Sequence, residues 1–258
     1  MARQRRHSRP SRRRGRFGGL YKVMSVLLIA AAVITACVVF FRVNAIQVEG
    51  NVRYTPEEII DASGIQLGDN LIALSRGRIS AGIRAQLPYV EGVSIHRSYP
   101  DKLVIRVTER VASASVDSPE GRWLISSQGK LLEKDNGSVK TVQIDGLTAV
   151  SPFAGGMLQV EEGEQATLGY VKELLAAVEN YGMLEQSTRI ECGSATSMTL
   201  YYGIYRIKLP RGGDYDYCVR LAQAALDSGL SSGKIQEGQG GLLDLTVTED
   251  RARFIPDH

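Results

Sequence analysis

An apolar run of nineteen residues, from Val23 to Phe41, constrains the fold of this chain more than any other feature. Ser25 and Thr35 are its only polar residues. As an α-helix the run would rise about 28 Å at 1.5 Å per residue, which is close to the hydrocarbon thickness of a bilayer. The sequence therefore predicts a single transmembrane helix at residues 23–41 and argues against one soluble globule.

Charge differs on the two sides of this run. Residues 1–48 hold ten Lys or Arg and no acidic residue, whereas residues 49–258 hold 21 basic and 28 acidic side chains, a net charge of −7. Nine of the ten N-terminal cations precede the run, and cationic flanks stay in the cytoplasm. We expect a basic cytoplasmic tail at residues 1–22, a plasma-membrane anchor, and residues 43–258 outside.

Three other interpretations of the N-terminal region fit the sequence less well than a membrane anchor with a basic cytoplasmic tail. A cleaved signal peptide has an apolar core of about 7–15 residues and a short basic front, both shorter than here. The segment Ile34-Thr35-Ala36-Cys37 is similar to a lipoprotein lipobox, but the apolar run continues past the cysteine. The run Arg12-Arg13-Arg14 could bind nucleic acid or anionic lipid, but no Phe, Tyr or Trp precedes Phe17 for base stacking. We favour a topology-setting tail and expect no nucleic-acid partner.

Residues 43–110 have the pattern of a compact α+β domain. Strands are expected at Val43–Val48, Val93–Tyr99 and Lys102–Arg110, with Pro100-Asp101 joining the last two. Between the first two strands the pattern changes to two helices. The order β-α-α-β-β predicts a small three-stranded sheet with two helices packed on it.

Both helices of this domain carry terminal signals. Thr55, Pro56 and Glu58 give the first helix an N-cap, a proline in its first turn and a capping box, and Gly64 ends it. The second helix is expected from Ser75 to Leu87, where Pro88 stops it. One of its faces is apolar, made by Ile79, Ile83 and Leu87.

Several short segments of this domain resemble the FtsQ/DivIB family of bacterial cell-division proteins. They are Ile46-Gln47-Val48-Glu49-Gly50-Asn51, Gly68-Asp69-Asn70-Leu71, Leu87-Pro88-Tyr89-Val90, Tyr99-Pro100-Asp101-Lys102-Leu103 and Val107-Thr108-Glu109-Arg110. Tyr89 and Tyr99 stand where that family often has Trp. The resemblance implies a POTRA domain just outside the membrane helix and a role in the divisome.

Residues 111–241 are expected to form a larger mixed β domain with two helices, followed by a terminal strand and tail at residues 242–258. The domain resembles the β domain that follows POTRA in the FtsQ/DivIB family. Its expected helices are Gln165–Gly182 and Asp216–Leu226, and its expected strands are Trp123–Ser126, Gly129–Leu132, Val142–Gly146, Ser197–Tyr202 and Ile204–Leu209. The terminal strand is expected at Leu242–Val247, resuming at Ala252–Ile255 after a turn or bulge at Glu249-Asp250-Arg251.

No catalytic, cofactor-binding or metal-binding constellation is expected. The chain has three histidines and three cysteines, and Cys192 and Cys218 are a possible pair. Gly233-Lys234 lacks the glycine spacing and the following Ser or Thr of a phosphate loop. Asp214 and Asp216 are interpreted as acids at a helix start, because a calcium loop needs more oxygen ligands in series. We therefore expect a protein that is not an enzyme, with no cofactor and no small-molecule substrate.

The terminal strand is the expected partner-binding region. An edge strand presents unpaired backbone groups to which another strand can add. The resemblance implies that this region, Leu243 to Ile255, pairs with the small bitopic proteins FtsB/DivIC and FtsL. Leu243, Leu245 and Val247 are expected to fill the core. The expected partner contacts are therefore Thr246, Thr248, Arg251, Arg253 and Phe254.

Two functions from different classes remain open from the sequence. The first is a non-enzymatic scaffold at the division septum that links the membrane to exterior partners regulating septal cell-wall synthesis. The alternative is an envelope sensor or secretion-type POTRA protein unrelated to division, with or without a wall-modifying activity. A wall enzyme would need a His, Cys or carboxylate cluster, which the sequence lacks.

Overall fold

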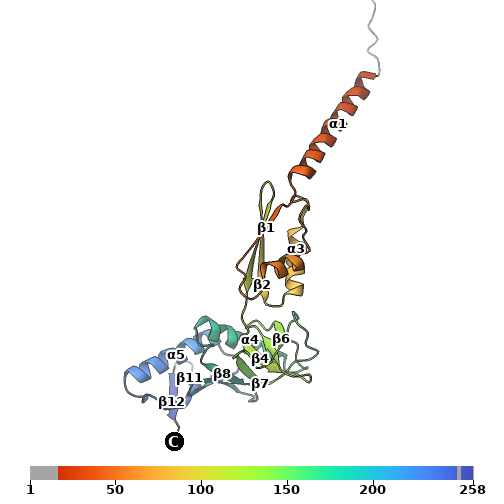
Figure 1. Ribbon diagram of the computed structural model, residues 1–258. Coiled ribbons are helices and arrows are strands. Elements are labelled where there is room, and N and C mark those ends of the chain that lie inside the picture. The colour runs from red at the N-terminus through yellow and green to blue at the C-terminus, as the bar shows by residue number, and fades with distance from the viewer. Residues whose placement is uncertain (1–16, 249–250, 258) are drawn as a thin grey trace, which may run out of the picture.

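The computed structural model describes residues 17–248 and 251–257, and it separates an N-terminal helix from two α+β parts (Figure 1). Helix α1 (Phe17–Phe40) contains most of the predicted membrane span and extends away from the rest of the chain. Within it, Gly19–Phe40 has a mean hydropathy of 2.8 over its most apolar window, in which no residue is buried. This helix fits a transmembrane segment. Most of the predicted cytoplasmic tail lies outside the described residues.

The part next to α1 is the predicted small α+β unit. Strand β3 lies in the middle of its sheet, parallel to β1 and antiparallel to β2. The order β-α-α-β-β is thereby confirmed. Buried side chains of both helices and of strands β2 and β3 form one core, against which the partly buried Ile46 and Val48 of β1 pack. The elements are β1 (Ala45–Glu49), α2 (Pro56–Ser63), α3 (Arg76–Gln86), β2 (Val90–Ser98) and β3 (Lys102–Glu109).

Local signals set the ends of α2 and α3 as predicted. The Thr55 hydroxyl accepts from the Glu58 N–H at 3.3 Å, and the Glu58 carboxylate accepts from the Thr55 N–H at 2.8 Å, which completes the capping box. Gly64 ends α2 with a φ of 66°, a conformation in which glycine has no Cβ penalty. The Ser75 hydroxyl accepts from the Arg78 N–H at 3.4 Å and so caps the start of α3.

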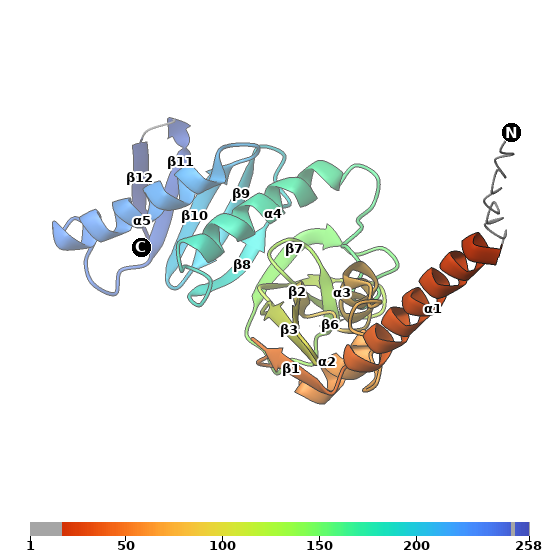
Figure 2. The same ribbon diagram turned by 90° about the horizontal axis from the view of Figure 1, so that it is seen from above.

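The second part is a nine-stranded mixed sheet with helices α4 and α5 on one face (Figure 2). The strand order is β12-β11-β10-β9-β8-β7-β4-β5-β6. The helices are α4 (Gln165–Asn180) and α5 (Tyr215–Ser231). The strands are β4 (Ala114–Asp117), β5 (Trp123–Ile125), β6 (Leu131–Lys134), β7 (Val142–Thr148), β8 (Ser187–Glu191), β9 (Ser197–Tyr202), β10 (Tyr205–Pro210), β11 (Gly241–Thr248) and β12 (Arg251–Pro256).

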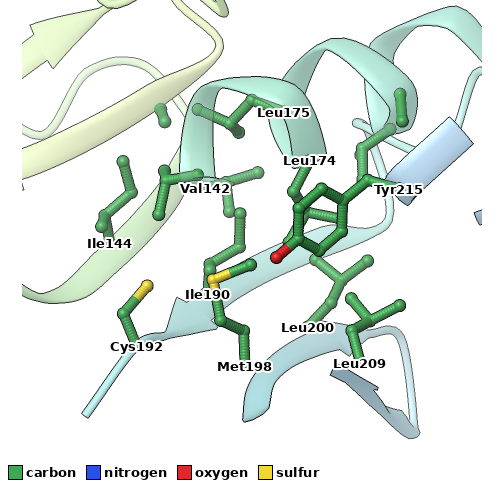
Figure 3. Packing of buried hydrophobic residues seen from close by; sticks show 14 of the residues in the cluster. Val142, Ile144, Leu174, Leu175, Ile190, Cys192, Met198, Leu200, Leu209 and Tyr215 are labelled. Carbon is green, nitrogen blue, oxygen red and sulfur yellow. The ribbon is translucent and has the colours of Figure 1, made fainter. Parts of the chain in front are cut away.

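The core of this part lies between the sheet and the helices (Figure 3). Leu174 and Leu175 of α4 face Ile190 and Leu200 of the sheet, and all four are fully buried. The opposite face of the sheet is polar, as is usual for a sheet with one solvated side, and it carries ion pairs such as Arg189 with Asp145.

The cysteines of the second part belong to this core and are both free. Burial raises the pKa of the Cys192 thiol to about 12. It also raises the pKa of Cys218. A raised thiol pKa keeps the protonated form, so these cysteines behave as small apolar side chains.

The two α+β parts meet at a joint that we define by Arg53, Tyr89 and Glu133. The Tyr89 hydroxyl donates to the Glu133 carboxylate at 2.6 Å, and Arg53 pairs with the same carboxylate at 2.9 Å. The Arg53 guanidinium also lies 4.0 Å from the centre of the Tyr89 ring. Beneath these groups Tyr89 packs on buried Leu124 and Leu132. Burial, with the hydrogen bond to Glu133, raises the pKa of Tyr89.

Candidate partner-binding edge

Strand β12 is the last strand on one side of the nine-stranded sheet (Figure 2). It pairs antiparallel with β11, which in turn runs parallel to β10. In residues 17–248 and 251–257, no strand pairs with the outer side of β12. Its outward backbone groups therefore have no strand partner in the described chain.

The opposite edge of the same sheet, strand β6, is covered at its start by the chain itself. The Leu131 N–H donates to the Gly156 carbonyl, and the Gly155 N–H donates to the Leu131 carbonyl, both at 2.8 Å. Lys130 forms a further isolated bridge with Met157. The loop around Gly155 thus takes the outward hydrogen-bonding positions of Leu131, the first residue of β6.

The direction of the backbone along β12 follows from its last contacts. The Asp257 N–H donates to the Gly240 carbonyl at 3.1 Å. Asp257 and every second residue before it, such as Ile255 and Arg253, therefore point their backbone groups at β11. Because direction alternates along a strand, the N–H and C=O of Phe254 point to the open side. Pro256 has the same parity as Phe254, and there its missing N–H removes no bond to β11.

The side chains of β12 divide between two faces. Phe254 and Ala252 face the helices and pack against the core, and the Phe254 ring lies 6.3 Å from that of Tyr205. A Cβ on Gly241 would come within 2.6 Å of the Phe254 ring, so glycine makes room for it. Arg253 and Ile255 lie on the polar face, where Ile255 is 40% exposed.

A polar cluster holds the start of this edge on the solvated face of the sheet. Asp244 pairs with Arg253 in register, lies 3.8 Å from the Lys208 ammonium, and accepts from the Thr246 hydroxyl at 2.6 Å. Burial alone would raise the pKa of Asp244. The hydrogen bonds from Thr246, together with the charges of Lys208 and Arg253, outweigh burial and lower this pKa.

A bulge in the β11–β12 hairpin corrects one sequence-based prediction. The register passes from the pair Asp244–Arg253 to the pair Thr248–Arg251. Between these two pairs β11 contains more residues than β12, which defines a bulge in β11. The alternation of faces is lost there, and Val247 is 55% exposed instead of filling the core. Leu243, which precedes the irregular segment, and Leu245, which lies at its start, are buried as predicted.

Two grooves flank the edge. One, of about 440 Å³, lies between β12, α5 and the loop before β11, and Phe254, Ala252 and Ile235 contribute to its walls. The other, of about 610 Å³, lies between the bulged end of β11 and the start of α5, with Val247 and Asp214 among its lining residues. Side chains of an added strand would therefore find a partly apolar groove on the helix side of β12.

Comparison with known proteins shows which family this chain resembles. The sequence pattern described as "POTRA domain, FtsQ-type" matches residues 41–110. The cell division protein FtsQ of Syntrophotalea carbinolica is 29% identical over 224 residues, which cover 81% of this chain and 76% of that protein. The cell division protein DivIB of Clostridium botulinum is 22% identical over 90% of each chain.

Over most of its length, this chain is similar to cell division proteins of the FtsQ/DivIB family. A third relative, the cell division protein DivIB of Clostridium tetani, is 32% identical over 127 residues, 48% of this chain. That match spans 47%, about half, of the Clostridium tetani protein. Similarity to this family supports a role in the bacterial divisome.

The predicted contact residues all lie in the β11–β12 hairpin, but their surroundings differ. Thr246 and Arg253 are exposed, whereas Phe254 is half-buried with its backbone on the open side. Thr248 and Arg251 form the pair next to the hairpin turn, and their side chains lie outside the described residues. The expected turn at Glu249-Asp250 also lies outside them.

Two exposed apolar residues of the β11–β12 hairpin, Val247 and Ile255, were not among the contacts predicted from the sequence. Alternation from Phe254 indicated that Ile255 faces away from the core, whereas nothing in the sequence signalled the bulge at Val247. In residues 17–248 and 251–257, no group of three His, Cys, Asp or Glu is placed to hold a metal ion. The edge presents backbone groups without a strand partner in the described chain and the exposed side chains of Arg253 and Ile255.

Proposed function

We propose that this chain is a non-enzymatic bitopic scaffold whose β12 edge receives a strand from small division partners. The observation that carries the proposal is the difference between the two sheet edges: the start of β6 is covered by the chain's own loop, and β12 has no strand partner in the described chain. The implied partners are FtsB/DivIC-like and FtsL-like bitopic proteins. Through them the scaffold would link the membrane to the regulation of septal cell-wall synthesis.

The chemistry of the edge specifies the added strand. Its backbone would accept from the Phe254 N–H and donate to the Phe254 carbonyl, each bond contributing about 1 kcal/mol. On the helix side an apolar side chain would enter the groove beside Phe254 and Ile235. On the solvated side an acidic side chain would complement Arg253, and an apolar one would cover Ile255.

Orientation is part of the same proposal. The basic residues before α1 support a cytoplasmic N-terminus, and both α+β parts would then lie outside with the partners' exterior segments. A fluorescent fusion is expected at the septum of dividing cells. A fusion spread evenly around the envelope would favour the sensor or secretion-type alternative.

A photo-crosslinking experiment tests the edge directly. A photoreactive phenylalanine replaces Ile255 or Arg253 in the full chain, and the matched control carries it at exposed Lys134 on the covered β6 edge. We expect crosslinks to the FtsB/DivIC-like or FtsL-like protein from the β12 positions and not from Lys134. Equal crosslinking at the two edges, or partner co-purification that survives truncation at Gly241, would overturn the proposal.

A further inference from the structure

The chain leaves α1 and enters the core of the first exterior part within three residues. Val43 is fully buried there, and its N–H donates to the Asp69 carbonyl at 2.8 Å. The Leu71 N–H donates to the Phe41 carbonyl at 2.8 Å, and Leu71 is also fully buried. No free linker separates the helix from the domain, so the loop at residues 67–72 is held directly beside the helix end.

Large apolar side chains are exposed at this end of the domain. Leu67 is 69% exposed and Ile72 is 47% exposed, on either side of the buried Leu71. Tyr99, at the tip of the β2–β3 hairpin, is 58% exposed, and its ring lies 5.6 Å from the Phe41 ring. Figure 1 shows this hairpin tip next to the end of α1. We call Leu67, Ile72 and Tyr99 the membrane-proximal patch.

The position of α1 decides what lies next to this patch. If the apolar run spans the hydrocarbon, its boundary falls near Phe41, and headgroups extend roughly 5–8 Å further on each side. Loop residues bonded to Phe41 and Val43 fall in that layer. Tyrosine is enriched at this depth in membrane proteins because its ring is apolar and its hydroxyl is polar.

The charges beside the patch suit phospholipid. Helix α3 begins two residues after the loop's last turn, with exposed Arg76 and Arg78 in its first turn and no acidic residue there. These cations add to the positive end of the helix dipole, an arrangement that anions stabilise. In the part of the chain that the structure describes, neither guanidinium has an ion-pair partner. Arg42, between α1 and the loop, is exposed as well.

We propose that the membrane-proximal patch rests in the headgroup layer of the bilayer, with Arg42, Arg76 and Arg78 toward lipid phosphates. The bilayer is the occupant because the patch is continuous with the end of the membrane helix. This contact fixes the tilt of the exterior parts against the membrane. It goes beyond the scaffold function and does not depend on any partner at β12.

Tryptophan quenching by brominated lipid tests the contact in the full chain. The only tryptophan, Trp123, lies in the second exterior part and supplies a constant background. We add one tryptophan by L67W or I72W and reconstitute each protein in phosphatidylcholine–phosphatidylglycerol vesicles brominated near the headgroup. The matched control is V52W, because Val52 is 91% exposed in the same domain but beside the joint residue Arg53.

We expect the added emission of L67W and I72W to fall by about half, because an interfacial side chain lies within about 5–10 Å of the headgroup–acyl boundary. The V52W emission should not fall. Combining L67W with R76Q and R78Q should reduce its quenching in anionic vesicles. Quenching of L67W and I72W no greater than that of V52W would overturn the proposal, and would direct attention to a protein partner at the patch.

Discussion

The two edges of the nine-stranded sheet are treated in opposite ways by the same chain. Strand β6 is bonded to the loop around Gly155 and lies next to the joint, whereas β12 lacks a partner on its outer side within residues 17–248 and 251–257. The edge next to the POTRA domain is therefore covered at its start within the protein, whereas the far edge has no such cover in the described residues. Because the chain bonds one of its own loops to the first sheet edge, the lack of a strand partner at the second edge, within the described residues, is a specific feature of this fold.

The largest effect is expected from breaking the closed side at Tyr89. Y89A removes a buried ring from Leu124 and Leu132, so we expect the free energy of unfolding to fall by about 3 kcal/mol. Denaturant unfolding followed by Trp123 fluorescence measures the loss. The control is Y99A, which removes an exposed ring and should change stability by less than about 0.5 kcal/mol. If Y89A and Y99A lose the same stability, the joint does not stabilise the closed edge.

Local sequence signals predicted much of the fold. The caps of α2 and α3 depend on residues within three or four positions, so Thr55, Gly64 and Ser75 could be read directly. The small sheet followed from the order of its elements. Strands β4 and β8 were missed because each is short and holds polar residues, with Ser115 and Ser187 buried in a sheet that pairs them on both sides.

The candidate site was predictable only in part, for a different physical reason. That the last strand pairs with a partner was expected from the family resemblance, and Arg253 was predicted as one of its contacts. The covering of β6 by residues around Gly155 and the joint of Arg53 with Glu133 depend on contacts between distant segments. No periodicity within a segment reports such contacts, and none reports the bulge that exposes Val247.

A substitution on the exposed face of β12 should lower the affinity for the partner and leave the free energy of unfolding unchanged. I255D places a carboxylate on the exposed face of β12, where an added strand would cover it. We expect affinity for the FtsB/DivIC-like partner to fall about tenfold, or about 1.4 kcal/mol, as for a residue central to an interface. Binding of the purified exterior segment of the partner to the full chain in detergent measures it.

The matched control for I255D carries K134D on the covered edge, where the same carboxylate should leave affinity unchanged. Unfolding midpoints of both variants should match the parent, because both positions are exposed. An equal loss of affinity at the two positions would mean that the edges are not distinguished by the partner.

The attachment of β12 itself should depend on pH through Asp244. Because its folded-state pKa is lowered, Asp244 contributes stability above its unfolded pKa of about 4, and this contribution disappears as pH falls through the folded pKa. At neutral pH, D244N should lose about 1 kcal/mol of unfolding free energy. The difference between parent and D244N should shrink below about pH 4. A difference that stays constant down to the acid transition would exclude this charge as its origin.

The smallest effect is expected from the ion pair at the joint. Removing this pair distinguishes the contribution of charge to stability from that of the buried Tyr89 ring. Arg53 and Glu133 are both partly exposed, so water screens their attraction. E133Q keeps an acceptor for the Tyr89 hydroxyl and should cost about 0.5 kcal/mol, with little change in 1 M salt. R106Q, which breaks the exposed pair with Glu49, is the control and should behave alike. A loss in E133Q as large as in Y89A would mean that charge rather than the buried ring closes this edge.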